Sequence, residues 1–137
     1  MGAPWVYGSA GEGPAAPGQP SIAALRRDYG LPALGPVERL YGVVGRPVGH
    51  SLSPRLHNGG YRELGVPALY LAFEPESFGD FWLEVVEGGL FDDLGMPLSG
   101  LSITAPFKQA ALAVAGAASP LAERIGAVNT LVRQGGV

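Results

Sequence analysis

Three short polar segments in an otherwise apolar chain carry the side chains that could do chemistry. The first, residues 48–58, places hydroxyl, imidazole and amide groups where a strand is expected to be followed by a helix: His50, Ser51, Ser53, His57 and Asn58. The other two, residues 104–108 and 127–130, lie at or near the ends of expected strands. In open α/β sheets, ligands bind outside the carboxyl ends of the strands. We therefore expect the three segments to form one site.

Ser51 and Ser53 offer two hydroxyl groups beside an expected helix N-terminus, which is a favourable place for a carboxylate or a phosphate. Ser53 also has a structural explanation, because it stands at the expected N-cap and is followed by Pro54. Ser51 has no such explanation and is the stronger candidate for an anion ligand. His50 and His57 do not form a metal-ligand spacing, so the sequence predicts no metal site. We expect His57 to make a structural hydrogen bond.

Lys108 is the only lysine in the chain, because the other eight basic residues are arginines. A lysine can release its proton when its surroundings lower its pKa, whereas an arginine in a protein does not. The expected position of Lys108 in the first turn of a helix should favour the neutral amine. These features favour an acid/base role or a hydrogen bond to a substrate hydroxyl. The alternative is a surface lysine near a loop.

Asn129 and Thr104 are polar residues within apolar strand sequences. A buried amide must be paired, so Asn129 is expected either to fix the fold or to contact a ligand. Thr104 is either a ligand hydroxyl or simply a β-branched strand residue. Residues 11–16 weakly match a dinucleotide fingerprint, but Pro14 and Pro17 would break the helix that this motif must open.

Strands alternate with helices along the chain, and these elements must position the polar segments. Strands are expected at 40–45, 68–73, 101–104 and 128–133, and helices at 53–64, 77–87, 106–115 and 119–125. The inner face of the first of these helices should carry Leu56, Gly60 and Leu64. The second should pack through one apolar stripe: Phe78, Phe81, Trp82 and Val85. This alternation predicts an α/β fold with a mainly parallel sheet flanked by helices.

Composition narrows the classes of function. The 137 residues suit one domain, and 47% hydrophobic with 15% charged residues allow a packed core. A net charge of -3 argues against nucleic acid or an anionic membrane as the main partner. The chain has no cysteine, which excludes disulfides and thiolate chemistry and is compatible with a cytoplasmic location. It shows neither a signal peptide nor the run of about 20 apolar residues that spans a bilayer.

The amino-terminal part differs from the rest. Residues 8–20 are rich in Gly, Pro and Ala and cannot form a helix or a central strand. A short helix is expected over 21–29, with Ser21 as its N-cap, and a linker follows it. We therefore divide the chain into residues 1–36, which should pack loosely or not at all, and residues 37–137, which should form the folded domain.

Taken in order, the polar segments resemble the N-terminal, substrate-binding domain of shikimate dehydrogenases. Residues 41–58 are similar to that family's opening strand and serine pair, residues 100–108 to its lysine motif, and residues 125–130 to its asparagine motif. The resemblance covers residues 40–133. It implies the family's α/β fold and a part in the reversible, NADP-dependent reduction of 3-dehydroshikimate to shikimate, a step of aromatic amino-acid biosynthesis.

The resemblance also implies roles for individual residues. Ser51 and Ser53 would bind the shikimate carboxylate, while Thr104, Lys108 and Asn129 would hold the ring hydroxyls. Lys108 would be the catalytic residue, serving the hydroxyl that is oxidised. The ligand would be shikimate or 3-dehydroshikimate, with quinate as an alternative. NADP would be bound by a domain that this chain lacks, so no cofactor-binding residue is expected here.

Two features depart from the family pattern. Ser102 stands where the family usually has an asparagine. The family also pairs its lysine with an aspartate beyond the asparagine motif, and the chain stops at Val137 before such a residue. The expectation is therefore a substrate-binding part that does not turn over substrate alone. A binding or regulatory module without chemistry is the alternative.

Residues 4–33 have a second, weaker resemblance, to the C-terminal end of a type I 3-dehydroquinate dehydratase. It rests on residues 16–19, which follow Trp5-Val-Tyr-Gly-Ser. In that family the glutamine at the position of Gln19 contacts substrate, and a serine stands where this chain has Ala15. The pairing implies a bifunctional dehydratase–dehydrogenase, with this chain spanning the junction of its two parts.

Overall fold

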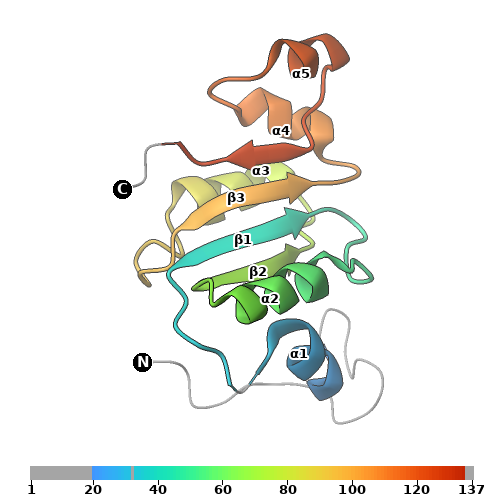
Figure 1. Cartoon of the computed structure of the whole chain (residues 1–137). Helices are drawn as coiled ribbons and strands as arrows, with labels where there is room; N and C mark the ends of the chain where they lie inside the picture. The colour runs from blue at the N-terminus through green and yellow to red at the C-terminus, as the bar shows by residue number, and fades with distance from the viewer. Residues whose placement is uncertain (1–19, 32, 135–137) are drawn as a thin grey trace.

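The computed structural model describes residues 20–31 and 33–134 and contains one four-stranded sheet (Figure 1). The strands are β1 (Arg39–Val44), β2 (Ala68–Phe73), β3 (Leu98–Ile103) and β4 (Thr130–Val132), in the spatial order β2-β1-β3-β4. β1 runs parallel to β2 and β3, and β4 runs antiparallel to β3. The expected α/β fold with a mainly parallel sheet flanked by helices is confirmed.

The helices cover the two faces of the sheet and its β4 end (Figure 1). They are α1 (Ile22–Tyr29), α2 (Ser53–Leu64), α3 (Phe78–Phe81), η1 (Trp82–Glu87), α4 (Lys108–Val114) and α5 (Pro120–Ile125). α2 lies on one face, and α3 with η1 on the other. In the described part of the chain, no helix is long and apolar enough to cross a membrane.

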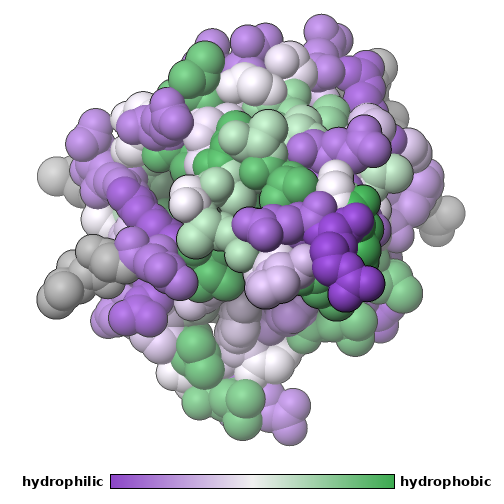
Figure 2. Space-filling model, turned by 90° about the horizontal axis from the view of Figure 1, so that it is seen from above, coloured by the Kyte–Doolittle hydropathy of each residue, from purple (hydrophilic) through white to green (hydrophobic). Residues whose placement is uncertain are grey.

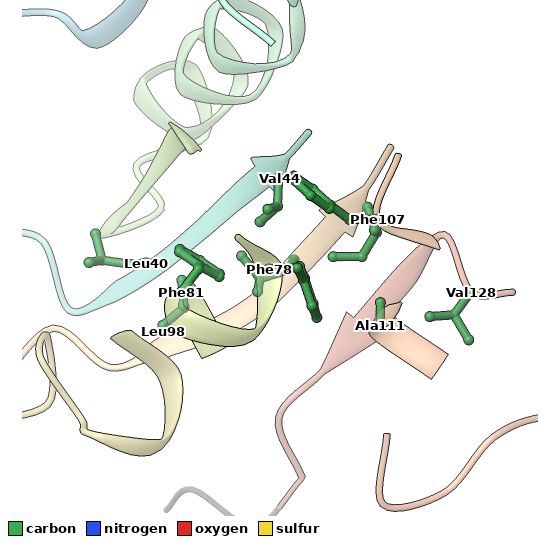
Figure 3. Packing of buried hydrophobic residues seen from close by; sticks show 10 residues of the cluster. Leu40, Val44, Phe78, Phe81, Leu98, Phe107, Ala111 and Val128 are labelled. Atoms are coloured by element: carbon green, nitrogen blue, oxygen red, sulfur yellow. The ribbon is translucent and has the colours of Figure 1, made fainter. Parts of the chain in front are cut away.

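Two apolar clusters hold these layers together, because successive residues of a strand point to opposite faces. On the α3 side, Leu40 and Val44 pack against Phe78, and Phe107 joins them from the turn before α4 (Figure 3). On the α2 side the cluster is smaller and is built on Val43, Val48 and Tyr70. The α2 face is therefore held less by apolar packing.

The inner face of α2 differs from the expected one. Leu56 and Leu64 are 70% and 78% exposed, whereas Pro54 and Asn58 are buried. Counting apolar residues favours the leucines, but a buried amide decides the rotation of this helix. Asn58 accepts a hydrogen bond from the backbone N–H of Tyr70 (2.7 Å) and donates one to its carbonyl (2.9 Å).

The expected helix over 77–87 is confirmed in position but changes type along its length. Ser77 accepts a hydrogen bond from the Asp80 N–H (3.3 Å) and so caps α3. After one turn the helix widens into the π-helix η1. The expected stripe of Phe78, Phe81, Trp82 and Val85 packs against the core.

The third helix begins later than expected. Residues 104–107 form a tight turn, in which the Phe107 N–H donates to the Thr104 carbonyl over 3.0 Å. α4 consequently begins at Lys108 instead of Pro106. The strand before the turn begins earlier than expected, at Leu98, because it pairs with β1 along its length.

α1 does not fit the expectation of loose packing over residues 1–36. Its N-cap Ser21 is confirmed, since its hydroxyl accepts the Ala24 N–H over 3.1 Å. The helix packs against α2, and the second N–H of the Asn58 amide donates to the Asp28 carbonyl over 2.9 Å. The expectation for residues 1–19 lies outside the described residues.

Candidate substrate site

The carboxyl ends of β1, β2 and β3 lie side by side at one edge of the sheet (Figure 1). The Thr104 N–H donates to the Val44 carbonyl over 2.9 Å, so the segment after β3 begins beside the end of β1. Gly45 makes this approach possible, because a Cβ atom there would collide with the Thr104 methyl group. The polar segments at 46–53 and 104–108 are therefore neighbours.

Asn129 and Lys108 lie at the same edge, further toward β4. The Ile103 N–H donates to the Asn129 carbonyl over 2.7 Å, which fixes the segment before β4 beside the end of β3. The Val128 N–H donates to the Lys108 carbonyl over 3.0 Å, which ties the first turn of α4 to the same segment. The structure thus brings the candidate residues of all three segments to one edge of the sheet.

The two serines exchange the local roles expected of them. Ser53 is the first residue of α2, the N-cap position is Leu52, and Leu52 makes no capping bond. The Ser51 hydroxyl instead accepts the Ser53 N–H over 3.3 Å, because a turn joins the Ser51 N–H to the Val48 carbonyl (2.9 Å). The Ser53 hydroxyl makes no hydrogen bond to any other residue that the structure describes.

Lys108 and Asn129 line a cavity of about 910 Å³ between α4, α5, β3 and β4. Its other walls are mainly apolar side chains of these elements and of η1. Figure 2 views this end of the molecule from above and shows apolar surface gathered between polar side chains. Ser51, Ser53 and Thr104 do not belong to its lining, so they and the Lys108–Asn129 pair occupy neighbouring parts of the edge.

Asn129 is not the buried amide that its apolar context predicts. Its side chain is exposed, and its amide oxygen accepts the Thr130 hydroxyl over 3.1 Å. The short strand β4 is the outermost strand of the described sheet, so the apolar pattern around it does not bury every residue. The exposed Asn129 amide, just before this strand, is available to a ligand.

His57 and Ser102 both contact Tyr70. The Tyr70 hydroxyl donates to the Ser102 hydroxyl over 2.9 Å, across the face that α2 covers. His57 stacks on the Tyr70 ring, with centroids 4.2 Å apart and planes 9° from parallel. His57 makes no hydrogen bond to the residues that the structure describes, so stacking takes the place of the structural hydrogen bond expected for it. Among the described residues no three His, Cys, Asp or Glu side chains could together hold a metal ion.

Glu74 belongs to this edge and was not singled out from the sequence. It is the first residue after β2, and its Oε2 accepts the backbone N–H groups of Val48 (2.8 Å) and Gly49 (3.1 Å). A glutamate directly after an apolar strand was the available signal, but its partners are 26 and 25 residues away in the sequence. Only the parallel pairing of β1 with β2 brings them together.

Comparison with known proteins gives consistent matches. The family model described as shikimate dehydrogenase substrate binding domain matches residues 43–131. A shikimate dehydrogenase (NADP(+)) of Haloarcula marismortui is 50% identical over 97 residues, which are 71% of this chain and 34% of that protein. A chloroplastic bifunctional 3-dehydroquinate dehydratase/shikimate dehydrogenase of Arabidopsis thaliana is 36% identical over 119 residues, 87% of this chain and 18% of that protein.

Solved structures agree with these matches. Shikimate 5-dehydrogenase of Thermus thermophilus in complex with NADP(H) and shikimate aligns with a TM-score of 0.56 and 35% identity, over 69% of this chain and 33% of that one. The Mycobacterium tuberculosis enzyme gives a TM-score of 0.56 and 39% identity, over 70% and 35%. The chain thus spans about a third of the length of most of these relatives.

Proposed function

This chain belongs to the shikimate dehydrogenase substrate-binding domain family, and we propose that it is the substrate-binding part of an NADP-dependent shikimate dehydrogenase. The reaction is the reversible reduction of 3-dehydroshikimate to shikimate. The observation that carries the proposal is the meeting of a serine pair, a threonine, a lysine and an asparagine at one sheet edge.

The roles proposed for the residues follow from their chemistry. A carboxylate at the start of α2 would receive hydrogen bonds from Ser51 and Ser53, and the helix dipole there favours an anion. The Ser51 oxygen already accepts a backbone N–H, which leaves its own proton free to donate. Thr104 and Asn129 would hold ring hydroxyls. Lys108 would hold or accept the proton of the hydroxyl that is oxidised.

We place the NADP site outside the described residues. A dinucleotide needs a glycine-rich turn whose backbone N–H groups meet the pyrophosphate. The loops that follow β1, β2 and β3 each contain a proline instead: Pro47, Pro75 and Pro106. In the first of these loops the N–H groups of Val48 and Gly49 already bind the Glu74 carboxylate, so they are not available to a pyrophosphate. We assign to this chain substrate binding, substrate orientation and the proton role of Lys108, and no contact with NADP.

Titration of the chain with shikimate tests the proposal. Ser53→Ala should weaken binding about ten-fold or more, because a hydrogen bond to a charged group contributes about 1.5 to 3 kcal/mol. Ser99→Ala is a matched control, since Ser99 lies near the amino end of β3 and, among the described residues, its hydroxyl bonds only the Pro97 carbonyl. Equal affinity of the Ser53→Ala variant and the parent chain would refute the assignment.

We further propose that the protein is a bifunctional dehydratase–dehydrogenase. In this view residues 1–36 end a dehydratase barrel and provide a linker, and residues 37–137 form the shikimate-binding domain. The Arabidopsis match supports this proposal. It covers 119 of the 137 residues and therefore includes α1, which precedes the dehydrogenase domain. The test is an assay of 3-dehydroquinate dehydration with the full reading frame, and no activity there would reject the dehydratase half.

A cytoplasmic location is also a proposal, and the chloroplastic name of the Arabidopsis relative gives the competing location. Fluorescence of the tagged full-length protein in its own cells distinguishes the two.

A further inference from the structure

The loop between β1 and α2 is held by a side chain from a different strand. The Glu74 carboxylate leaves the carboxyl end of β2 and accepts both the Val48 N–H (2.8 Å) and the Gly49 N–H (3.1 Å) with a single oxygen. Hydrogen bonds with an ionised acceptor are shorter and stronger than neutral ones. The loop is thereby attached to the sheet at the two residues that precede its polar stretch.

These two residues determine where the serines lie. Val48 is 5% exposed and packs with Val43 and Tyr70, and its carbonyl accepts the Ser51 N–H over 2.9 Å. The Ser51 hydroxyl in turn accepts the Ser53 N–H. A continuous set of hydrogen bonds therefore runs from the Glu74 carboxylate through the turn to the Ser51 hydroxyl and the Ser53 backbone N–H, the residues that carry both serine side chains.

We propose that Glu74 is a positioning residue for the carboxylate-binding serines, holding their loop in the conformation that binds the substrate anion. This inference rests on the proposed function of the same site. Glu74 has two opposing effects on an anion. Its negative charge repels the anion, whereas its hydrogen bonds fix the donors that bind the anion. We assign the larger effect to the fixed loop.

The two effects are separable because they respond differently to substitution. Glu74→Gln removes the charge but keeps an oxygen that accepts both N–H groups. Glu74→Ala removes the charge and the acceptor together. If the loop then populates its binding conformation only in part, the apparent affinity falls by that fraction. Calorimetric titration with shikimate should give about ten-fold weaker binding for Glu74→Ala and parent-like or tighter binding for Glu74→Gln.

Glu76→Ala is the matched control. Glu76 is an exposed carboxylate two residues further along, and it makes no hydrogen bond to the described residues through its side chain. The Glu76→Ala substitution removes the same charge from the same segment, so it should leave the affinity for shikimate unchanged or slightly higher. Hydrogen exchange of the Val48 and Gly49 amides gives a second readout. Their protection should fall in Glu74→Ala and remain in Glu74→Gln.

The outcomes distinguish the inference from the function on which it rests. If the parent binds shikimate and Ser53→Ala weakens binding, but Glu74→Ala binds as well as Glu74→Gln, Glu74 is a surface charge and the inference fails alone. If the parent does not bind shikimate, the proposed function fails and this inference with it. Thermal unfolding of each variant separates a local effect from loss of the fold.

Discussion

At the scale of single residues, Ser51 and Ser53 have different roles although they lie only two residues apart. The Ser51 oxygen receives the first N–H of α2, so this side chain belongs to the helix start as well as to the candidate site. Ser53 lies inside the helix, and its hydroxyl is not used by the described part of the fold. Substitutions should therefore separate stability from binding.

Ser51→Ala should lower stability as well as shikimate affinity. Ser51→Ala removes the hydrogen bond that its hydroxyl accepts from the Ser53 N–H, which contributes about 0.5 to 1.5 kcal/mol. Ser53→Ala should lower affinity and leave the free energy of unfolding within about 0.5 kcal/mol of the parent value. Urea unfolding followed by circular dichroism measures both. Equal destabilisation by the two substitutions would mean that the Ser51 hydroxyl does not stabilise the start of α2.

Lys108→Arg tests whether the amine must exchange a proton. Arginine keeps the charge but does not release a proton in proteins. In the chain joined to a nicotinamide-binding domain, we expect Lys108→Arg to lower kcat almost as much as Lys108→Ala, by about 10² to 10⁴, with a smaller change in KM. Steady-state rates with shikimate give both constants. A near-normal kcat for Lys108→Arg would assign the lysine a fixed-charge role only.

At the scale of elements, the outer edge of β2 explains how α2 and α1 are attached. An edge strand exposes unpaired N–H and C=O groups, which proteins cover or block. The Asn58 amide pairs with both backbone groups of Tyr70 as a neighbouring strand would. The Val66 carbonyl accepts the Ala68 N–H over 2.8 Å further along the same strand. A side chain and a turn thus complete the sheet on this side.

Asn58→Ala should be among the most destabilising single substitutions in α2. It leaves the Tyr70 N–H and carbonyl without partners, and each unpaired buried group costs about 1 to 3 kcal/mol. We expect a loss of about 2 to 5 kcal/mol in the free energy of unfolding, measured by urea denaturation. The control is Leu56→Ala on the same helix, which is 70% exposed and should change stability by less than about 0.5 kcal/mol. A larger loss of stability for Leu56→Ala than for Asn58→Ala would mean that α2 packs through the leucine face expected from the sequence.

At the scale of the whole molecule, we expect the attachment of α1 to depend on the charge of Tyr29, the last residue of this helix. Burial is the main cause that raises the pKa of Tyr29, the Asp28 carboxylate adds to it, and a backbone hydrogen bond from Ala72 opposes it. Burial likewise raises the pKa of Tyr61 on α2. The folded state therefore prefers the neutral phenols at both positions.

The sign of the resulting pH dependence follows from linkage. The contribution of a raised tyrosine pKa to stability is fully present below the unfolded value of about 10. It is lost as the pH rises through the higher folded value. Tyr29→Phe should therefore lose less stability between about pH 9 and pH 11 than the parent, measured by urea unfolding at each pH. Parallel curves for parent and variant would show that Tyr29 stays accessible to solvent when α1 is docked.

Local signals in the sequence were sufficient for most of the elements. The bounds of β2 and α2 and the cap Ser21 all follow from backbone preferences of a few neighbouring residues. The alternation of strands with helices was enough to predict a mainly parallel sheet. The positions of Thr104, Lys108 and Asn129 at or near strand ends were enough to predict that they lie at one end of the sheet.

Long-range pairing decided what the sequence could not. The Asn58 amide sets the rotation of α2, because it bonds the backbone of Tyr70, 12 residues away on β2. The pattern of apolar residues along the helix does not reveal such a contact. Glu74 bonds the loop between β1 and α2 only because β1 lies beside β2. Local propensity depends on neighbours in the chain, whereas a buried hydrogen bond depends on which distant backbone groups lack a partner, and only the assembled sheet determines that.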